Sequence, residues 1–327
     1  MACQYQGQFV RLLVLAFLLA CTSCKRSLLS RGQYRLAELN VEAPLSHSIP
    51  EKLWTKFDGN RTLSIAKRIT SFGPRPSGTE ANRSARNLII AEMSESGWEI
   101  REQRFSERSP ENKIIDFCNL VAGFSKGPIA GKRLLIGTHF DSLRTQIFSD
   151  RSASASAAST AILIELARIL ALNPVLASQV ELVFFDGANP FREVTSIDGF
   201  FGSRFFAEML DVNREIDRIS AAVILENVGS GNFSLNVTRG SDPVLVSKFR
   251  TAASSLDLNL KSAGRWIVTN QDPFAERGVP AITLFDADSP ILNTADDTAE
   301  HLSADSLAKT GTLIVYFISS DLAFSNQ

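Results

Sequence analysis

Short, almost continuously apolar segments alternate along this chain with longer segments whose apolar residues recur at helical spacing. Residues 134–136 and 180–185 are examples of the first kind, and residues 80–96 of the second. An apolar strand of this kind is buried on both faces, which is typical of parallel sheets covered by helices on either side. The sequence therefore predicts an α/β fold with three layers, α/β/α, around a central mixed, largely parallel twisted sheet.

The same pattern gives the expected elements. Strands are predicted over residues 98–105, 113–124, 133–138, 180–185, 221–225 and 280–285. Helices are predicted over residues 80–96, 157–172, 202–210, 243–256 and 303–322. Ligand sites in such sheets collect where strands end at the carboxyl edge. Three of these strand ends carry unusual polar sequence, at residues 137–142 (GTHFDS), 185–190 (FDGANP) and 225–229 (LENVG).

The N-terminus is typical of an export signal. Arg11 precedes an apolar run, residues 12–20, that is too short for a bilayer span of about 20 residues. The run ends in Leu-Leu-Ala-Cys, which resembles a bacterial lipobox with Cys21 as the lipidated residue. We therefore expect a signal peptide over residues 1–21, a tether over 22–50 and a single domain over 51–327. A plain secretory signal is the alternative.

These features predict an exported protein of the bacterial cell envelope, anchored in the membrane as a lipoprotein and facing the periplasm or the cell surface. The net charge of -1 gives no electrostatic case for nucleic acid as a partner. Cys118 is the only one of the four cysteines that falls beyond the tether, in an apolar stretch. It is predicted to be a buried thiol, and no disulfide framework is available.

Acidic and histidine residues follow two of the predicted strands. His139 and Asp141 come directly after one strand, and Glu226 follows another. A His-x-Asp pair can ligate a metal, or the aspartate can orient the histidine. The other two histidines are His47, in the tether, and His301, which is predicted to lie on the surface. At most one histidine is thus well placed for a metal.

Several motifs, in this order, resemble those of the glutaminyl-peptide cyclotransferase (glutaminyl cyclase) and zinc aminopeptidase superfamily, the family 28 metallopeptidases. They are FGPRPSG at 72–78, GTHFDS at 137–142, ELAR at 165–168, FFDG at 184–187, GSR at 202–204, PF at 273–274, RGVP at 277–280 and TADD at 294–297. The long loop over residues 190–201 is similar to that of the cyclase branch. The resemblance implies a zinc-exopeptidase-like fold.

The resemblance also shows which of the family's working residues are missing here. Its zinc ligands fall at Ala155, Asn189 and Asn293, and its general acid/base falls at Ala188. A further acidic residue and its neighbouring histidine correspond to Asn270 and Gln271, and two tryptophans that line the cyclase pocket correspond to Val194 and Leu292. His139, Asp141 and Glu226 remain as a residual pocket.

These replacements remove the chemistry of the family. A catalytic zinc takes about three protein ligands and one open position. Alanine cannot ligate a metal, and asparagine offers only a neutral carbonyl oxygen. No zinc or other cofactor is therefore expected, and no catalytic residue is assigned. The prediction is a degenerate member of the family that binds peptides, protein N-termini or another partner, although the resemblance itself leaves open whether the protein is an enzyme.

Two alternatives remain from the sequence. The first is an active glutaminyl-peptide cyclotransferase or metallo-aminopeptidase with a metal site rebuilt on His139, Asp141 and Glu226. The second is nucleophilic catalysis by a serine of residues 152–159, which would need His139 as its base.

Overall fold

The computed structural model describes residues 52–124, 131–143, 152–195, 197–231, 233–264, 267–292, 294–320 and 323. All of them belong to one unit of the chain, residues 49–327. The predicted signal peptide, the tether with His47 and the predicted lipidation site Cys21 lie outside the described residues, and so does Asn293.

The described residues form one eight-stranded mixed sheet. Its strands are β1 (Glu99–Arg108), β2 (Ile114–Gly123), β3 (Arg133–His139), β4 (Val180–Phe185), β5 (Ile219–Glu226), β6 (Leu235–Val237), β7 (Leu260–Ser262) and β8 (Ala281–Phe285). They follow the spatial order β1-β2-β4-β3-β5-β8-β6-β7. The central neighbours β4, β3, β5 and β8 are all parallel, whereas β1, β2 and β6 pair with antiparallel neighbours. The predicted fold class is confirmed.

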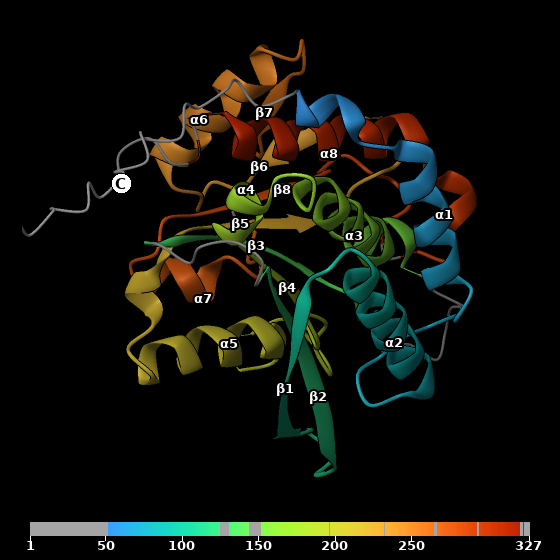
Figure 1. Cartoon of the computed structure of the whole chain (residues 1–327). Helices are drawn as coiled ribbons and strands as arrows, with labels where there is room; N and C mark the ends of the chain where they lie inside the picture. Colours follow the sequence, from blue (N-terminus) through green and yellow to red (C-terminus); the bar gives the residue numbers. More distant parts are fainter. Residues whose placement is uncertain are drawn as a thin grey trace, which may run out of the picture. The chain divides into compact units, whose positions relative to one another are not determined.

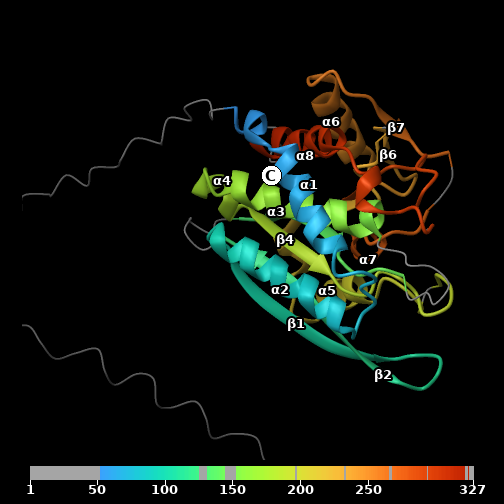
Figure 2. The same cartoon turned by 90° about the vertical axis from the view of Figure 1, so that its right-hand side faces the viewer.

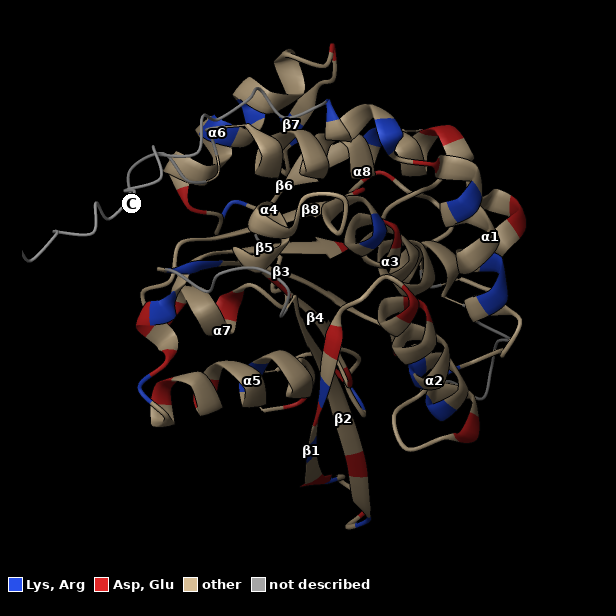
Figure 3. Ribbon diagram, viewed as in Figure 1, with Lys and Arg blue, Asp and Glu red and all other residues tan. Residues whose placement is uncertain are grey.

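Helices cover both faces of this sheet (Figure 1; Figure 2). They are α1 (Gly59–Thr70), α2 (Glu80–Glu95), α3 (Ala158–Leu170), α4 (Pro174–Ser178), α5 (Phe201–Val212), α6 (Pro243–Ser254), α7 (Asp272–Ala275) and α8 (Ala304–Ser319). In Figure 1, α5 and α7 lie on one side of the strands, and α1, α2, α3 and α8 lie on the other. Charges of both signs are interspersed along α2 and β1, whereas the charged residues of α1 are all basic (Figure 3).

Alternate residues of each central strand belong to two different cores. Leu134 and Ile136 of β3 pack into the larger core, beneath α1, α2, α3, α6 and α8. Leu135 between them faces the smaller core, where Phe206 of α5 and Phe274 of α7 pack. Successive side chains of a strand point to opposite faces. Burial of both faces is why these strands contain almost no polar residues.

The predicted strands and helices are all present, and their ends agree with the structure within three residues. The helices α1, α4 and α7 and the three-residue strands β6 and β7 were not predicted from the sequence. Cys118 is buried and free, as expected, and burial raises the pKa of its thiol to about 11.

Among the described residues, only the stretch 153–170 is long and apolar enough to cross a membrane. It is buried inside the domain and includes the core helix α3.

Candidate ligand pocket at the carboxyl edge of the sheet

The four parallel strands in the centre of the sheet end at the same edge. His139 is the last residue of β3, and Glu226 is the last residue of β5. Gly137 pairs with Ile224 across these strands, so the register places His139 opposite Glu226. A cavity of about 260 Å³ opens at this edge and is lined by both residues. The structure thus brings together two of the three residues predicted to form the residual pocket.

The cavity is lined by both polar and apolar residues. Its polar lining residues are His139, Asn189, Glu226, Asn227, Thr269, Asn270 and Asp286. Its apolar lining residues are Ala155, Ala188, Pro190, Val194, Phe200, Ile267, Val268, Phe285, Ala287 and Leu292. Every described position that the resemblance assigns to a zinc ligand or to the general acid/base therefore lines this cavity. Val194 and Leu292, the positions of the cyclase tryptophans, line it as well.

Asp141 does not line the cavity but lies beneath His139. Its Oδ1 is 3.2 Å from His139 Nδ1 and accepts a hydrogen bond of 3.0 Å from the backbone N–H of Ala188. Its Oδ2 accepts hydrogen bonds from the backbone N–H of Asn189 at 3.1 Å and from Asn189 Nδ2 at 2.9 Å. We call these three N–H donors of Ala188 and Asn189 the Asp141 cradle. The aspartate therefore orients the histidine and is itself held by the turn after β4.

The charges of this pair reinforce each other. Burial opposes ionisation of Asp141, but the hydrogen bond and charge of His139 and the donors of the cradle outweigh it, so the pKa of Asp141 is lowered. Burial likewise disfavours the imidazolium form of His139, but Asp141 and the charge of Glu226 outweigh it and raise the pKa of His139. The buried carboxylate of Asp141 thus has the partner that a buried charge requires.

Glu226 has a different environment. Its Oε1 accepts hydrogen bonds from the backbone N–H of Asn270, at 3.1 Å, and from Asn270 Nδ2. Burial raises the pKa of Glu226, although the charge of His139 and the donors of Asn270 reduce the effect. The Oδ1 atom of Asn270 is buried and has no hydrogen-bond partner among the described residues. An amide at position 270 thus binds the glutamate where a second carboxylate would repel it.

Ala155 lies in a single turn of π-helix, Ala153–Ala157, that leads into α3. Asp297 holds this turn: its Oδ1 accepts hydrogen bonds from the N–H and the hydroxyl of Ser154, at 2.6 and 2.8 Å, and its Oδ2 accepts one from the N–H of Ala155 at 3.1 Å. Asp297 therefore fixes the backbone of this turn, while the side chain of Ala155 presents only a methyl group to the cavity.

The described serines of residues 152–159 do not form a pair with His139. Ser154 donates to Asp297, Ser156 donates to the carbonyl of Ser152, and Ser159 donates to the carbonyl of Ser156. His139 Nδ1 is engaged by Asp141. The geometry therefore gives no support to serine nucleophilic catalysis, which requires a serine in contact with its base.

Gln271 lies next to the pocket in sequence but does not line it. Its Nε2 donates to Thr238 Oγ1 at 2.9 Å, and its Oε1 accepts from Ser241 Oγ at 3.2 Å. This side chain is fully buried in a neutral network behind the cavity. His301 is exposed, as predicted.

The described residues do not fit a catalytic zinc. Within the described ranges, no group of three or more His, Cys, Asp and Glu side chains is placed to hold a metal ion. Asp141 accepts at both oxygens from the cradle and His139, so its acceptor positions are filled. His139 and Glu226 alone are one ligand short of the usual set. The structure therefore does not assemble the rebuilt three-residue metal site of the alternative prediction.

Several lining residues were not predicted from the sequence. Asp286 and Ala287 directly follow the buried strand β8, so their position at the carboxyl edge was a usable signal, as it was for Asn227 in the polar strand end 225–229. Ile267, Val268 and Thr269 come from an irregular segment before α7, and no periodic pattern marks them.

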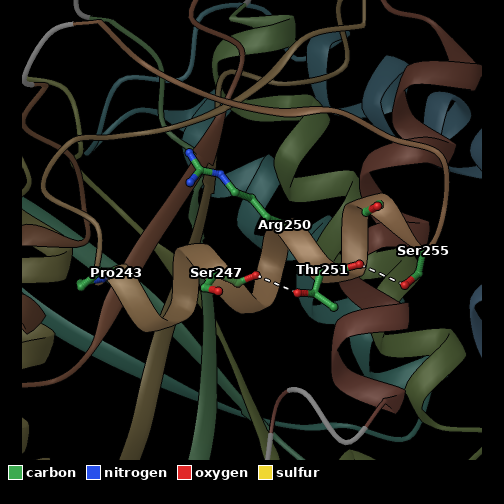
Figure 4. A pocket seen from close by; sticks show the side chains of 6 residues that line it. Pro243, Ser247, Arg250, Thr251 and Ser255 are labelled. Atoms are coloured by element: carbon green, nitrogen blue, oxygen red, sulfur yellow. Dashed lines mark hydrogen bonds between the residues drawn. The ribbon is translucent and has the colours of Figure 1, made fainter.

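A second concavity, of about 520 Å³, lies along α6 (Figure 4). Pro243, Ser247, Arg250, Thr251, Ser254 and Ser255 line it. Thr251 and Ser255 donate to backbone carbonyls of their own helix, and Arg250 donates to Ser262. These hydroxyl groups are therefore satisfied within the fold. This surface has no acid–base pair, and the pocket at the sheet edge is the better candidate site.

The family follows from comparison with known proteins. The sequence model of peptidase family M28 matches residues 119–318. The chain belongs to peptidase family M28. Over 265 residues this M28 protein is 25% identical to the glutaminyl-peptide cyclotransferase of Drosophila melanogaster, a match that covers 72% of the chain and 74% of that protein. Over 321 residues it is 24% identical to a glutaminyl-peptide cyclotransferase-like protein of Bos taurus, covering 88% of the chain and 80% of the relative.

Solved structures of other proteins share this fold. A glutaminyl cyclase from an Acidobacteriales bacterium superimposes with a TM-score of 0.73 at 21% identity, covering 85% of this chain and 97% of that one. A Zn-dependent exopeptidase from Parabacteroides distasonis superimposes with a TM-score of 0.72 at 19% identity, covering 84% and 100%. These structures show the fold, and the sequence relatives support the glutaminyl cyclase branch that the motifs predicted.

Proposed function

We propose that this M28 protein binds peptides or protein N-termini in the pocket at the sheet edge, without zinc and without cyclising or hydrolysing them. The proposal rests on the hydrogen bonds that the turn after β4 makes. At the two positions where the resemblance expects the general acid/base and a zinc ligand, Ala188 and Asn189 donate three hydrogen bonds to Asp141.

The replacements are mutually consistent for a pocket without a metal. A cluster of buried carboxylates is stable only when a cation neutralises it, because like charges repel and burial penalises each of them. Ala155, Ala188, Asn189 and Asn270 remove four such groups relative to the family's pattern and leave neutral contacts. Loss of the general acid/base removes a factor of about 10² to 10⁴ in rate, and loss of the metal removes the Lewis acid that polarises a carbonyl.

The shape of the pocket supports a peptidic ligand. A volume of about 260 Å³ is at the small end for ligand pockets and suits a single residue with part of its backbone. Glu226 and His139 offer hydrogen-bonding groups, and Val194, Val268 and Leu292 offer apolar contacts. One named relative is a glutaminyl-peptide cyclotransferase and the other is a glutaminyl-peptide cyclotransferase-like protein, which supports a peptide as the ligand.

The test measures metal content and activity on the same sample. Protein expressed without residues 1–21 is analysed for zinc after gel filtration, and is assayed for cyclisation of a peptide with N-terminal glutamine. We expect no stoichiometric zinc and no cyclisation, with binding of the peptide detected by calorimetry. A matched peptide whose N-terminus is acetylated serves as the ligand control, and we expect it to bind more weakly.

The control protein carries Ala155→Asp, Asn189→Glu and Asn293→His together, which restores the family's ligand set. We expect this variant to take up zinc where the wild type does not. About one tightly bound zinc per wild-type chain, with cyclisation at a rate equal to or above that of the variant, would show that the protein is an enzyme with a rebuilt site.

We also propose that the protein is exported and anchored in the bacterial envelope through a lipid on Cys21. The support is the short apolar run that ends in Leu-Leu-Ala-Cys. Metabolic labelling with a fatty acid should mark the wild type and not Cys21→Ser. Equal labelling of both would place the lipid at another residue, and release of the unlabelled wild type as a soluble protein would favour a plain secretory signal.

A further inference from the structure

The hairpin of β1 and β2 stands at the same edge of the sheet as the pocket. β2 pairs with β4 only through Leu120–Gly123, and β4 runs antiparallel to it. The earlier part of β2, from Ile114 to Asn119, therefore continues past the carboxyl end of β4. Both Figure 1 and Figure 2 show these two strands as a long pair that extends beyond the rest of the sheet.

The hairpin is fixed to the turn that follows β4. The N–H of Cys118 donates to Asp186 Oδ2 at 2.9 Å, and the N–H of Asp186 donates to Asn119 Oδ1 at 2.9 Å. The next residue, Gly187, has a φ of +78°. A Cβ atom at Gly187 would lie 2.4 Å from Cε1 of Phe117, so the ring of Phe117 packs directly on the backbone of this glycine.

The residues that follow Gly187 are those of the Asp141 cradle. The N–H groups of Ala188 and Asn189 hold the carboxylate of Asp141, and this carboxylate in turn engages Nδ1 of His139. The ring of Phe117 is therefore separated from the cradle by a single residue. Rotation of the Gly187 peptide would redirect the N–H of Ala188, because this N–H belongs to the peptide group that joins Gly187 to Ala188.

Other aromatic rings also hold the side chain of Phe117 in position. Its ring stacks on Phe105 of β1, at 5.1 Å between centroids, and on Phe201 at the start of α5, at 5.2 Å. Phe105 stacks in turn on Phe205 of α5 at 4.3 Å. Phe117 is 3% exposed, so the ring fills a closed space between the hairpin, α5 and Gly187.

We propose that Phe117 is a positioning residue for the pocket: by packing on Gly187 it fixes the Asp141 cradle and, through Asp141, the orientation of His139. The β1–β2 hairpin thereby helps to fix the geometry of the pocket, although none of its residues lines the cavity. A substitution in the hairpin then alters the pocket without touching a ligand. This inference deepens the proposed binding function but is tested without any ligand, so the two can fail independently.

The test compares Phe117→Leu with Phe105→Leu. Both remove one ring from the same aromatic stack, but only Phe117 contacts Gly187. Amide hydrogen exchange of Ala188 and Asn189 is measured by NMR relative to core amides of β3 and β4, which corrects for any change in global stability. We expect Phe117→Leu to speed exchange of the two cradle amides by about tenfold or more relative to the core, and Phe105→Leu to change it by less than about twofold.

The ring nitrogens of His139 give a second readout. In the neutral imidazole of the wild type, the contact with Asp141 fixes the proton on Nδ1, and ¹⁵N shifts recorded at a pH above the pKa of His139 should report this single form. We expect Phe117→Leu to mix the two tautomers and Phe105→Leu to leave them unchanged. If Phe117→Leu does not fold, Phe117→Met replaces it, with the same direction expected. Equal relative exchange in both variants, or unchanged cradle amides in the Phe117 variant, would overturn the proposal.

Discussion

Asn189→Asp offers the sharpest test of how the pocket is stabilised without a metal. In the wild type, Asn189 Nδ2 donates to Asp141 Oδ2 over 2.9 Å. The substitution keeps the size of the side chain but replaces this donor by a carboxylate oxygen. Asp141 is buried and its pKa is lowered, so it is ionised at neutral pH and the two carboxylates would repel each other.

The substitution Asn189→Asp destabilises the fold in two ways. Loss of a hydrogen bond to a charged group costs about 1.5–3 kcal/mol. Two carboxylates about 4 Å apart repel by about 4 kcal/mol at an effective dielectric constant of about 20. Asn189 is only partly buried, so solvent screens the new charge and the side chain can turn outward. We therefore expect the repulsion to contribute about half of that value, or ~2 kcal/mol, beyond the lost hydrogen bond.

Asn189→Ala separates the two parts, because it loses the hydrogen bond without adding a charge. Urea unfolding in the presence of a chelator should show Asn189→Asp to be less stable than Asn189→Ala by ~2 kcal/mol at pH 7.5. Repulsion raises the folded-state pKa of the new aspartate above its unfolded value, so the destabilisation is present above that raised pKa and is lost as the pH falls through it. The difference between the variants should therefore shrink at pH 4.5. Equal stability of the two variants at pH 7.5 would refute this account.

Two further predictions concern the support of the pocket and the core. Burial, with a contribution from the charge of Asp141, raises the pKa of Asp186 to about 7. This is above the unfolded value of about 3.9, so the stability that Asp186 contributes to the fold is complete below pH ~4. That stability falls by about 4 kcal/mol as the pH rises through 7. Unfolding between pH 4.5 and 8.5 should show this slope in the wild type and a flatter one in Asp186→Asn, and identical slopes would contradict the assignment. Gly311→Ala should destabilise the fold by about 1–3 kcal/mol, because a Cβ there would lie 2.0 Å from the ring of Phe57. Gly264→Ala is the matched control, since nothing lies within 4 Å of its added Cβ, and an equal loss in both variants would contradict the packing argument.

Periodicity in the sequence was enough to predict the central part of the fold. The strand β4, Val180–Phe185, was predicted to the residue, because burial on both faces leaves an apolar run that ends sharply at Asp186. The strands β6 and β7 were missed because three residues are too few to show a period. Helix α1 was missed although Asp58 caps it and Ile65, Ala66 and Ile69 form its buried side.

The sequence by itself also determined which chemical groups are present at the edge of the sheet: alanine or asparagine at the family's working positions, with His139, Asp141 and Glu226 retained. Only the tertiary structure decided what these groups do. Asp141 is not a third pocket residue beside the other two, because the N–H groups of Ala188 and Asn189 meet it from another strand end. Gln271 faces away from the cavity for a similar reason, since its partners Thr238 and Ser241 lie behind it. A hydrogen-bond partner distant along the chain leaves no local pattern, so its effect can be seen only when the strands are placed side by side.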